Sequence, residues 1–85
     1  MVRMYELKQK EVINIKDGFR FGFVCDVEID CDGKICAIIV PGPGRVFGVF
    51  GREQEYKIPW GCVTQLGEDL ILVEVDTVKV LVDCK

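Results

Sequence analysis

Short stretches in which apolar and polar residues alternate recur along the chain, and this period of two constrains the fold most. Residues 23–30 are the clearest case. In a strand, one face would carry Phe23, Cys25, Val27 and Ile29, and the other face would carry Asp26, Glu28 and Asp30 together with Val24. Such alternation is typical of a strand with one buried face. Only residues 4–10 could form a helical turn, so the sequence predicts an all-β domain, with the Phe23 parity facing the core.

Glycine-containing turns divide these stretches. Asp17-Gly18, Asp32-Gly33 and Gly67-Glu68-Asp69 each follow an alternating or apolar run, and glycine accepts a positive φ without steric penalty. Five or six short strands with turns every 8–12 residues or so indicate a small barrel or sandwich. A barrel is favoured because a closed sheet has no exposed edges. Residues 35–40 are almost entirely apolar, which predicts a strand buried on both sides or one that crosses between sheets.

Two further positions carry specific predictions. Gly22 lies inside a phenylalanine-rich strand, so we expect a backbone conformation or a close approach there that other residues resist. Near the C-terminus the apolar parity changes between Val75 and Val78. Asp76-Thr77 would then be either a two-residue hairpin, with Val75 opposite Val78, or a β-bulge. The sequence leaves these two alternatives open.

The chain of 85 residues is long enough for one domain, residues 1–85, and too short for two. No stretch approaches the roughly 18 consecutive apolar residues of a membrane-spanning helix. The first ten residues carry several charges and no apolar segment typical of an export signal. We therefore expect a cytoplasmic protein without a membrane span. The net charge of −3 argues against nucleic-acid binding, which usually needs a basic surface.

Catalytic and metal-binding constellations are missing from the sequence. It contains no histidine and no serine, so neither a Ser-His nor a Cys-His pair can form, and we expect no enzymatic activity. Cys25, Cys31 and Cys36 lack the Cys-x-x-Cys spacing of structural zinc sites. We expect free thiols, with Cys25 and Cys36 buried as small apolar residues that do not react in the native protein.

Three other patterns suggest sites but fit structural roles better. The acidic residues of 26–32 would place Ile39 where a calcium loop requires a glutamate, so we expect a solvated strand face that leads into a turn. The glycines of residues 42–51 lack the Lys-Ser/Thr of a phosphate-binding loop. Trp60 lies between apolar residues and is expected to anchor one end of the core. No cofactor is predicted.

Several short motifs follow one another in a recognisable order between about residues 6 and 75. They are Lys10-Glu11-Val12-Ile13-Asn14, Asp17-Gly18 with Gly22 and Asp26, Asp32-Gly33-Lys34-Ile35, Pro41-Gly42, Phe47-Gly48-Val49-Phe50-Gly51-Arg52, Ile58-Pro59-Trp60 and Gly67-Glu68-Asp69. This order resembles the PRC-barrel domain family, in particular its YlmC/YmxH-type sporulation proteins. The tail after Val75 departs from the family, because it is longer and more apolar than expected.

The resemblance implies a small six-stranded antiparallel barrel in a cytoplasmic protein linked to sporulation. It also implies a non-enzymatic protein-interaction module, which would self-associate, for example as a homodimer, or act as an adaptor. The alternative is a ribosome- or RNA-associated factor, by analogy with the PRC barrel of a ribosome maturation factor. That analogy concerns the fold alone.

One segment is the predicted protein-interaction site. Residues 46–50 are apolar on both strand faces and lie between a Pro/Gly-rich run and a charged run. A lone hairpin could not bury both faces in one small core, and an exposed apolar patch usually marks a contact surface. The predicted site residues are Arg45, Val46, Phe47, Val49, Phe50 and Arg52, with the two arginines as a polar rim. The alternative is that the segment folds back and plugs one end of the barrel.

Overall fold

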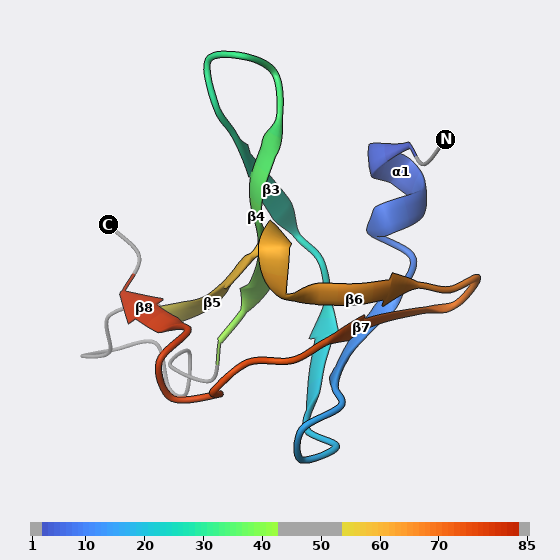
Figure 1. Ribbon diagram of the computed structural model, residues 1–85, viewed down its shortest axis with the longest axis vertical. Helices are drawn as coiled ribbons and strands as arrows, with labels where there is room; N and C mark the ends of the chain where they lie inside the picture. Colours follow the sequence, from blue (N-terminus) through green and yellow to red (C-terminus); the bar gives the residue numbers. More distant parts are fainter. Residues whose placement is uncertain (1–2, 43–53, 84–85) are drawn as a thin grey trace, which may run out of the picture.

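The computed structural model describes residues 3–42 and 54–83 (Figure 1). It contains a one-turn helix, α1 (Met4–Leu7), and a 3-10 turn, η1 (Trp60–Cys62). The strands are β1 (Glu11–Asn14), β2 (Arg20–Phe23), β3 (Asp26–Ile29), β4 (Ile35–Pro41), β5 (Gln54–Pro59), β6 (Val63–Leu66), β7 (Leu70–Val73) and β8 (Leu81–Asp83). The predicted segment 45–52 lies outside the described residues.

The strands form two four-stranded sheets. The first sheet has the order β2-β1-β7-β6, and the second has the order β3-β4-β5-β8. The all-β prediction is confirmed. The predicted closed barrel of six antiparallel strands is wrong, because the described residues form eight strands in two sheets, and β1 pairs with β7 in parallel. The chain passes from one sheet to the other between β2 and β3, between β5 and β6, and between β7 and β8. Strands that follow one another in the sequence are thereby divided between two sheets.

The alternating stretch of residues 23–30 is interrupted at Val24 and Cys25. Val24 is buried, and the Cys25 amide donates a hydrogen bond to the Ile39 carbonyl, 2.8 Å away. Phe23 and Ile29, predicted to face the core, are each 54% exposed. The prediction failed because parity holds only along one continuous strand, and here the chain passes from one sheet to the other.

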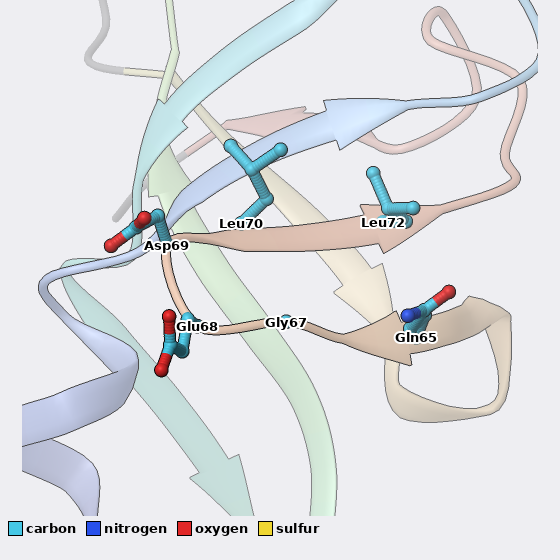
Figure 2. A pocket seen from close by; sticks show the side chains of 6 residues that line it. All are labelled: Gln65, Gly67, Glu68, Asp69, Leu70 and Leu72. Atoms are coloured by element: carbon cyan, nitrogen blue, oxygen red, sulfur yellow. The ribbon is translucent and has the colours of Figure 1, made fainter.

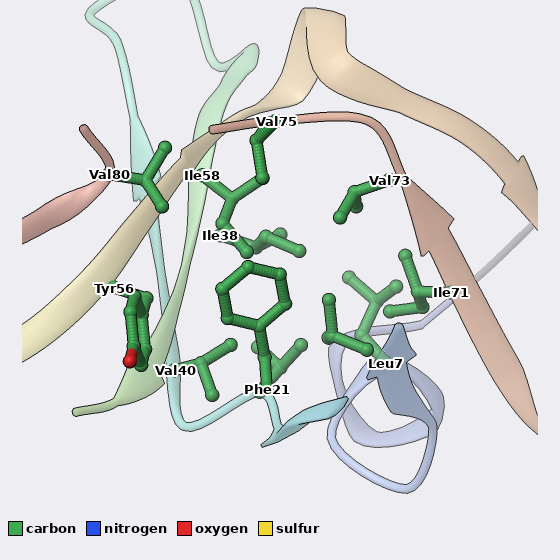
Figure 3. Packing of buried hydrophobic residues seen from close by; sticks show 12 residues of the cluster. Leu7, Phe21, Ile38, Val40, Tyr56, Ile58, Ile71, Val73, Val75 and Val80 are labelled. Carbon is green, nitrogen blue, oxygen red and sulfur yellow. The ribbon is translucent and has the colours of Figure 1, made fainter. Parts of the chain in front are cut away.

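The hydrophobic core lies between the two sheets (Figure 3). Phe21 of β2 packs edge-on against Tyr56 of β5, with ring centroids 4.9 Å apart. The double burial predicted for residues 35–40 holds for residues 37–40, which are all buried in a central strand of the second sheet, whereas Ile35 is half-buried and Cys36 is exposed. The buried cluster consists of Leu7, Val12, Phe21, Val24, Ile38, Val40, Tyr56, Ile58, Ile71, Val73, Val75 and Val80.

Gly22 has a φ of 106°, which confirms that the backbone here adopts a conformation that residues other than glycine resist. It pairs with Val12 where the register of β1 and β2 shifts. A Cβ atom at Gly22 would lie 3.8 Å from Val40 Cγ1, which is an ordinary contact. Glycine is therefore favoured at this position by the backbone conformation and not by a lack of space for a side chain.

Asn14 is fully buried at the end of β1. Its Nδ2 donates to the Val75 carbonyl at 2.8 Å, and its Oδ1 accepts from the Val75 amide at 3.3 Å and the Lys16 amide at 3.1 Å. The side-chain amide thus pairs with the backbone of Val75 much as a neighbouring strand would. It ties β1 to the segment through which the chain leaves β7.

The C-terminal segment forms neither the hairpin nor the bulge expected at Asp76-Thr77. Asp76 Oδ1 accepts from the Val78 amide at 3.0 Å and closes a turn, after which β8 pairs with β5 in the second sheet. Val75 and Val80 are buried, whereas Val78 is 79% exposed. The change of parity therefore marks a crossing between sheets.

Candidate interaction surface

The predicted interaction residues Arg45, Val46, Phe47, Val49, Phe50 and Arg52 lie outside the described residues, so this prediction remains open. The described residues offer a different surface on the outer face of the first sheet. Sequence reasoning missed it. A signal was present, because four consecutive apolar residues make up β7 and a sheet with one core can bury only alternate ones.

The pleat of β7 sends its side chains to opposite faces of the first sheet. Ile71 and Val73 are fully buried in the core, so Leu70 and Leu72 lie on the outer face. On β1, Val12 and Asn14 point inward, which leaves Glu11 and Ile13 outside. The parallel register places Glu11 beside Leu70 and Ile13 beside Leu72.

Phe23 adds a largely exposed aromatic side chain to this face on β2, where it pairs with Glu11 and is separated from Leu70 by that residue. We call Ile13, Phe23, Leu70 and Leu72 the outer patch. The residues come from three adjacent strands, β2, β1 and β7, so the patch is held on rigid structure and not on a loop.

An open hollow of about 240 Å³ lies at the end of the outer patch, where β6 turns into β7 (Figure 2). Figure 2 shows Leu70 and Leu72 along β7, with Gln65 on the adjacent strand. Small-molecule sites usually measure roughly 300–1,000 Å³, so this hollow suits a single side chain better than a whole ligand. Its lining residues are Gln65, Gly67, Glu68, Asp69, Leu70 and Leu72.

The turn at the rim of the hollow is held by backbone contacts. Lys10 Nζ donates to the carbonyls of Gly67 and Glu68, each at 2.6 Å. The Glu11 amide donates to the Asp69 carbonyl at 3.0 Å. The expected turn at these residues is confirmed, and the lysine stabilises it by binding carbonyl oxygens.

The rim also carries negative charge. Glu68 and Asp69 are exposed, and neither carboxylate makes a hydrogen bond or an ion pair within residues 3–42 and 54–83. Unpaired carboxylates beside an apolar hollow are suited to a basic group next to an apolar one.

A charged pair lies within the outer patch, because Glu11 of β1 stands between Phe23 of β2 and Leu70 of β7. Arg20 binds Glu11 through two contacts, Nε to Oε2 at 2.9 Å and Nη2 to Oε1 at 2.7 Å. These hydrogen bonds lower the pKa of the Glu11 carboxyl and raise the pKa of Arg20. The pair therefore stabilises the fold at pH values above the ordinary pKa of glutamate. This contribution is lost as the pH falls through the lowered pKa of Glu11.

β6 is an edge strand of the first sheet within the described residues. The register shifts between Val63 and Gln65, and Thr64 Oγ1 donates to the Leu72 carbonyl at 3.1 Å. A second hollow, of about 250 Å³, follows the strand and is lined by Trp60, Val63, Thr64, Gln65 and Leu66. Trp60 is half-buried and packs against the core, in agreement with its expected role as an anchor, but it also lines this hollow.

The cysteines differ from the prediction. Cys25, Cys31 and Cys36 are exposed, so the expected burial of Cys25 and Cys36 is wrong. Cys25 lies in the break between β2 and β3, and Cys36 lies at the start of β4, in a hairpin that projects beyond the sheets (Figure 1). Partial burial, followed by the charges of Glu55 and Asp26, raises the pKa of the Cys25 thiol.

The acidic run of residues 26–32 has the structural role that was expected. Asp30 Oδ1 accepts from the amides of Asp32 and Lys34, both at 2.9 Å, and so closes the turn between β3 and β4. Glu28 pairs with Lys57 at 3.0 Å on the exposed face of the second sheet.

The described residues contain no helix with the length and apolar character needed to cross a membrane.

Known proteins show which family the chain belongs to. The model of the PRC-barrel domain family matches residues 1–80. The chain is 43% identical to the probable sporulation protein YlmC of Bacillus subtilis (strain 168) over 74 residues. The aligned region covers 86% of this chain and 91% of YlmC. The chain is also 32% identical to the uncharacterized protein YmxH of the same bacterium over 77 residues, and this aligned region covers 87% of this chain and 89% of YmxH. An uncharacterized protein of Clostridium acetobutylicum is 36% identical to the chain over 75 residues. The aligned region covers 87% of this chain and 85% of the relative. The chain therefore belongs to the PRC-barrel domain family.

Proposed function

We propose that this protein is a non-enzymatic, cytoplasmic protein-interaction module that acts in sporulation and binds its partner through the outer patch. The observation that carries the proposal is the position of Leu70, which is exposed, and Leu72, which is half-buried, beside a hollow. The rim of this hollow holds the carboxylates of Glu68 and Asp69, which are unpaired within the part of the chain that the structure describes. Apolar surface of this kind on a soluble domain usually marks a contact site. The name of YlmC, a probable sporulation protein, supports the link to sporulation.

The partner would present an apolar side chain followed closely by Lys or Arg. The apolar side chain would enter the hollow against Leu70 and Leu72, and the cation would approach Glu68 or Asp69. Full burial of a leucine contributes about 1.5–3 kcal/mol. Leu70 is only 37% exposed, so its share is smaller. An exposed ion pair adds roughly 0.2–1 kcal/mol. These magnitudes support a modest affinity in which apolar burial outweighs charge.

Selection from a library of displayed random peptides tests the proposal even though the partner is unidentified. The full chain should enrich peptides in which an apolar residue precedes Lys or Arg. Leu70→Ser should weaken their binding markedly, and Glu68→Gln with Asp69→Asn should weaken it less and reduce its dependence on salt. Val78→Ser is the matched control, because Val78 is an exposed apolar residue outside the outer patch and should leave binding unchanged.

Two results would contradict the proposal. Enriched peptides could lack the apolar–basic pattern, or they could bind equally well to Leu70→Ser. An electrophoretic shift with RNA that weakens as salt increases would instead favour the RNA-associated alternative. At the rim of the hollow the carboxylates of Glu68 and Asp69 outnumber the ammonium group of Lys10, so the rim attracts phosphate groups poorly, which argues against that alternative.

A further inference from the structure

The edge strands of the described residues differ in charge. An edge strand exposes unpaired backbone N–H and C=O groups, and proteins commonly place charged residues there to prevent pairing with another chain. The strands at the edges are β2, β3, β6 and β8. Arg20 lies on β2, Asp26 and Glu28 lie on β3, and Asp83 lies on β8, whereas β6 reads Val-Thr-Gln-Leu and has no charge.

The surroundings of β6 suit an additional strand. A paired strand sends alternate side chains to the two faces of the sheet. The hollow beside Leu70 and Leu72 lies on one side of β6, and the hollow beside Trp60 and Leu66 follows the strand as well. Gln65 lines both hollows. The hollow beside Trp60 and Leu66 therefore has space for side chains that an added strand would bring, and the hollow beside Leu70 and Leu72 stays open to the partner of the proposed function.

We propose that β6 pairs with β6 of a second copy of this chain, in an antiparallel manner about a two-fold axis. The two first sheets would then join into one continuous sheet. Self-pairing of β3 would bring the carboxylates of Asp26 and Glu28 close to those of the second copy, and like charges across strands destabilise pairing. Self-pairing of β6 opposes no like charges.

The register within β6 agrees with this symmetry. Val63 pairs with Val73 and Leu66 pairs with Ile71, and both partners face the core, so Val63 and Leu66 lie on the same face despite the irregularity at Thr64. A two-fold axis between Thr64 and Gln65 would place Val63 opposite Leu66 of the second copy. The contact is self-complementary, as a two-fold interface requires.

This inference rests on the proposed function in one respect, namely that the domain acts by contact with protein surfaces. It adds that one partner is a second copy. The dimer would carry two outer patches on one continuous face, so that a partner with two matching segments would bind with higher avidity than a partner with one.

Charge substitutions at Gln65 test the inference. Gln65 lies at the centre of the proposed contact, so Gln65→Lys or Gln65→Glu would place two like charges near the axis. Wild-type protein should sediment as a dimer, and each variant alone should have a dimer dissociation constant raised on the order of tenfold. A mixture of the two variants should form the heterodimer. Gln9→Lys, the same substitution in the turn after α1, is the control and should leave the dimer intact.

Circular dichroism and thermal melting show whether each variant folds, and the restored heterodimer is itself evidence of folded chains. The inference is overturned if the wild-type chain sediments as a monomer at millimolar concentration. It is overturned equally if the Gln65 variants dimerise as wild type does, or if the mixture stays monomeric. Peptide binding that depends on Leu70 would survive all three results, so the proposed function can stand where this inference fails.

Discussion

Single residues whose chemistry differs from that of their neighbours determine several local features. Gly22 supplies the positive φ at the irregular point between β1 and β2. Asp30 closes the turn between β3 and β4 with one carboxylate oxygen. Lys10 holds the turn at the rim of the hollow by binding two carbonyls. Each role follows from one property of the residue, and each can be removed by one substitution.

Gly22→Ala should destabilise the protein by about 1–3 kcal/mol, because an L-residue at this φ is strained. The added methyl group has space beside Val40, so crowding contributes little. The free energy of unfolding in urea measures the loss. Gly61→Ala is the matched control, since Gly61 has open space around its Cβ position and no positive φ. Equal midpoints for the two variants would contradict the conformational argument.

Cys25 should react with iodoacetamide more slowly than Cys36 in the native protein, although both are exposed. The raised pKa of Cys25 leaves less thiolate, which is the reactive form, at neutral pH. Mass spectrometry of each cysteine-containing peptide follows the two rates. The difference should disappear in denaturant, and a difference of the same size in denaturant would show that the fold is not its cause.

Secondary-structure elements in this domain depend on contacts that are distant in sequence. β1 pairs in parallel with β7, and the Asn14 side chain extends this pairing to Val75 after β7 ends. The path from β7 to the second sheet therefore depends on one buried amide. β7 itself has apolar side chains on both faces, which places it in the core and in the outer patch at once.

Asn14→Ala should cost on the order of 2–4 kcal/mol, because it leaves the buried backbone groups of Val75 without their partner. Denaturant unfolding measures this loss. Gln9→Ala, a substitution on the exposed turn after α1, should change the midpoint little. An Asn14→Ala midpoint equal to that of wild type would show that the Val75 segment does not depend on this amide.

At the scale of the whole molecule, features set by local chemistry could be predicted from the sequence. The turns at Asp17-Gly18 and Asp32-Gly33 contain glycines at φ values of 77° and 83°, and they join paired strands as expected. The double burial of residues 37–40 in β4 also followed from the apolar run. Two sheets in place of one barrel could not be predicted, because sheet membership depends on pairings such as β1 with β7.

The outer patch was missed for a related reason. The alternation of Ile71, Val73 and Val75 is typical of a strand with one buried face. Leu70 and Leu72 form part of an exposed apolar surface only because β1 and β6 flank β7, and these pairings are distant in sequence. The sequence instead predicts a site at residues 45–52, because strand alternation would make residues 46–50 apolar on both faces.

Mapping the binding surface by nuclear magnetic resonance tests the central claim most directly. The isotope-labelled full chain would be titrated with an apolar–basic peptide enriched in the selection described above. The account predicts the largest amide shift changes at Gln65, Glu68, Leu70 and Leu72, and none of comparable size in the hairpin of β3 and β4. Shift changes concentrated at residues 45–52, or in that hairpin, with the outer patch unaffected, would contradict it.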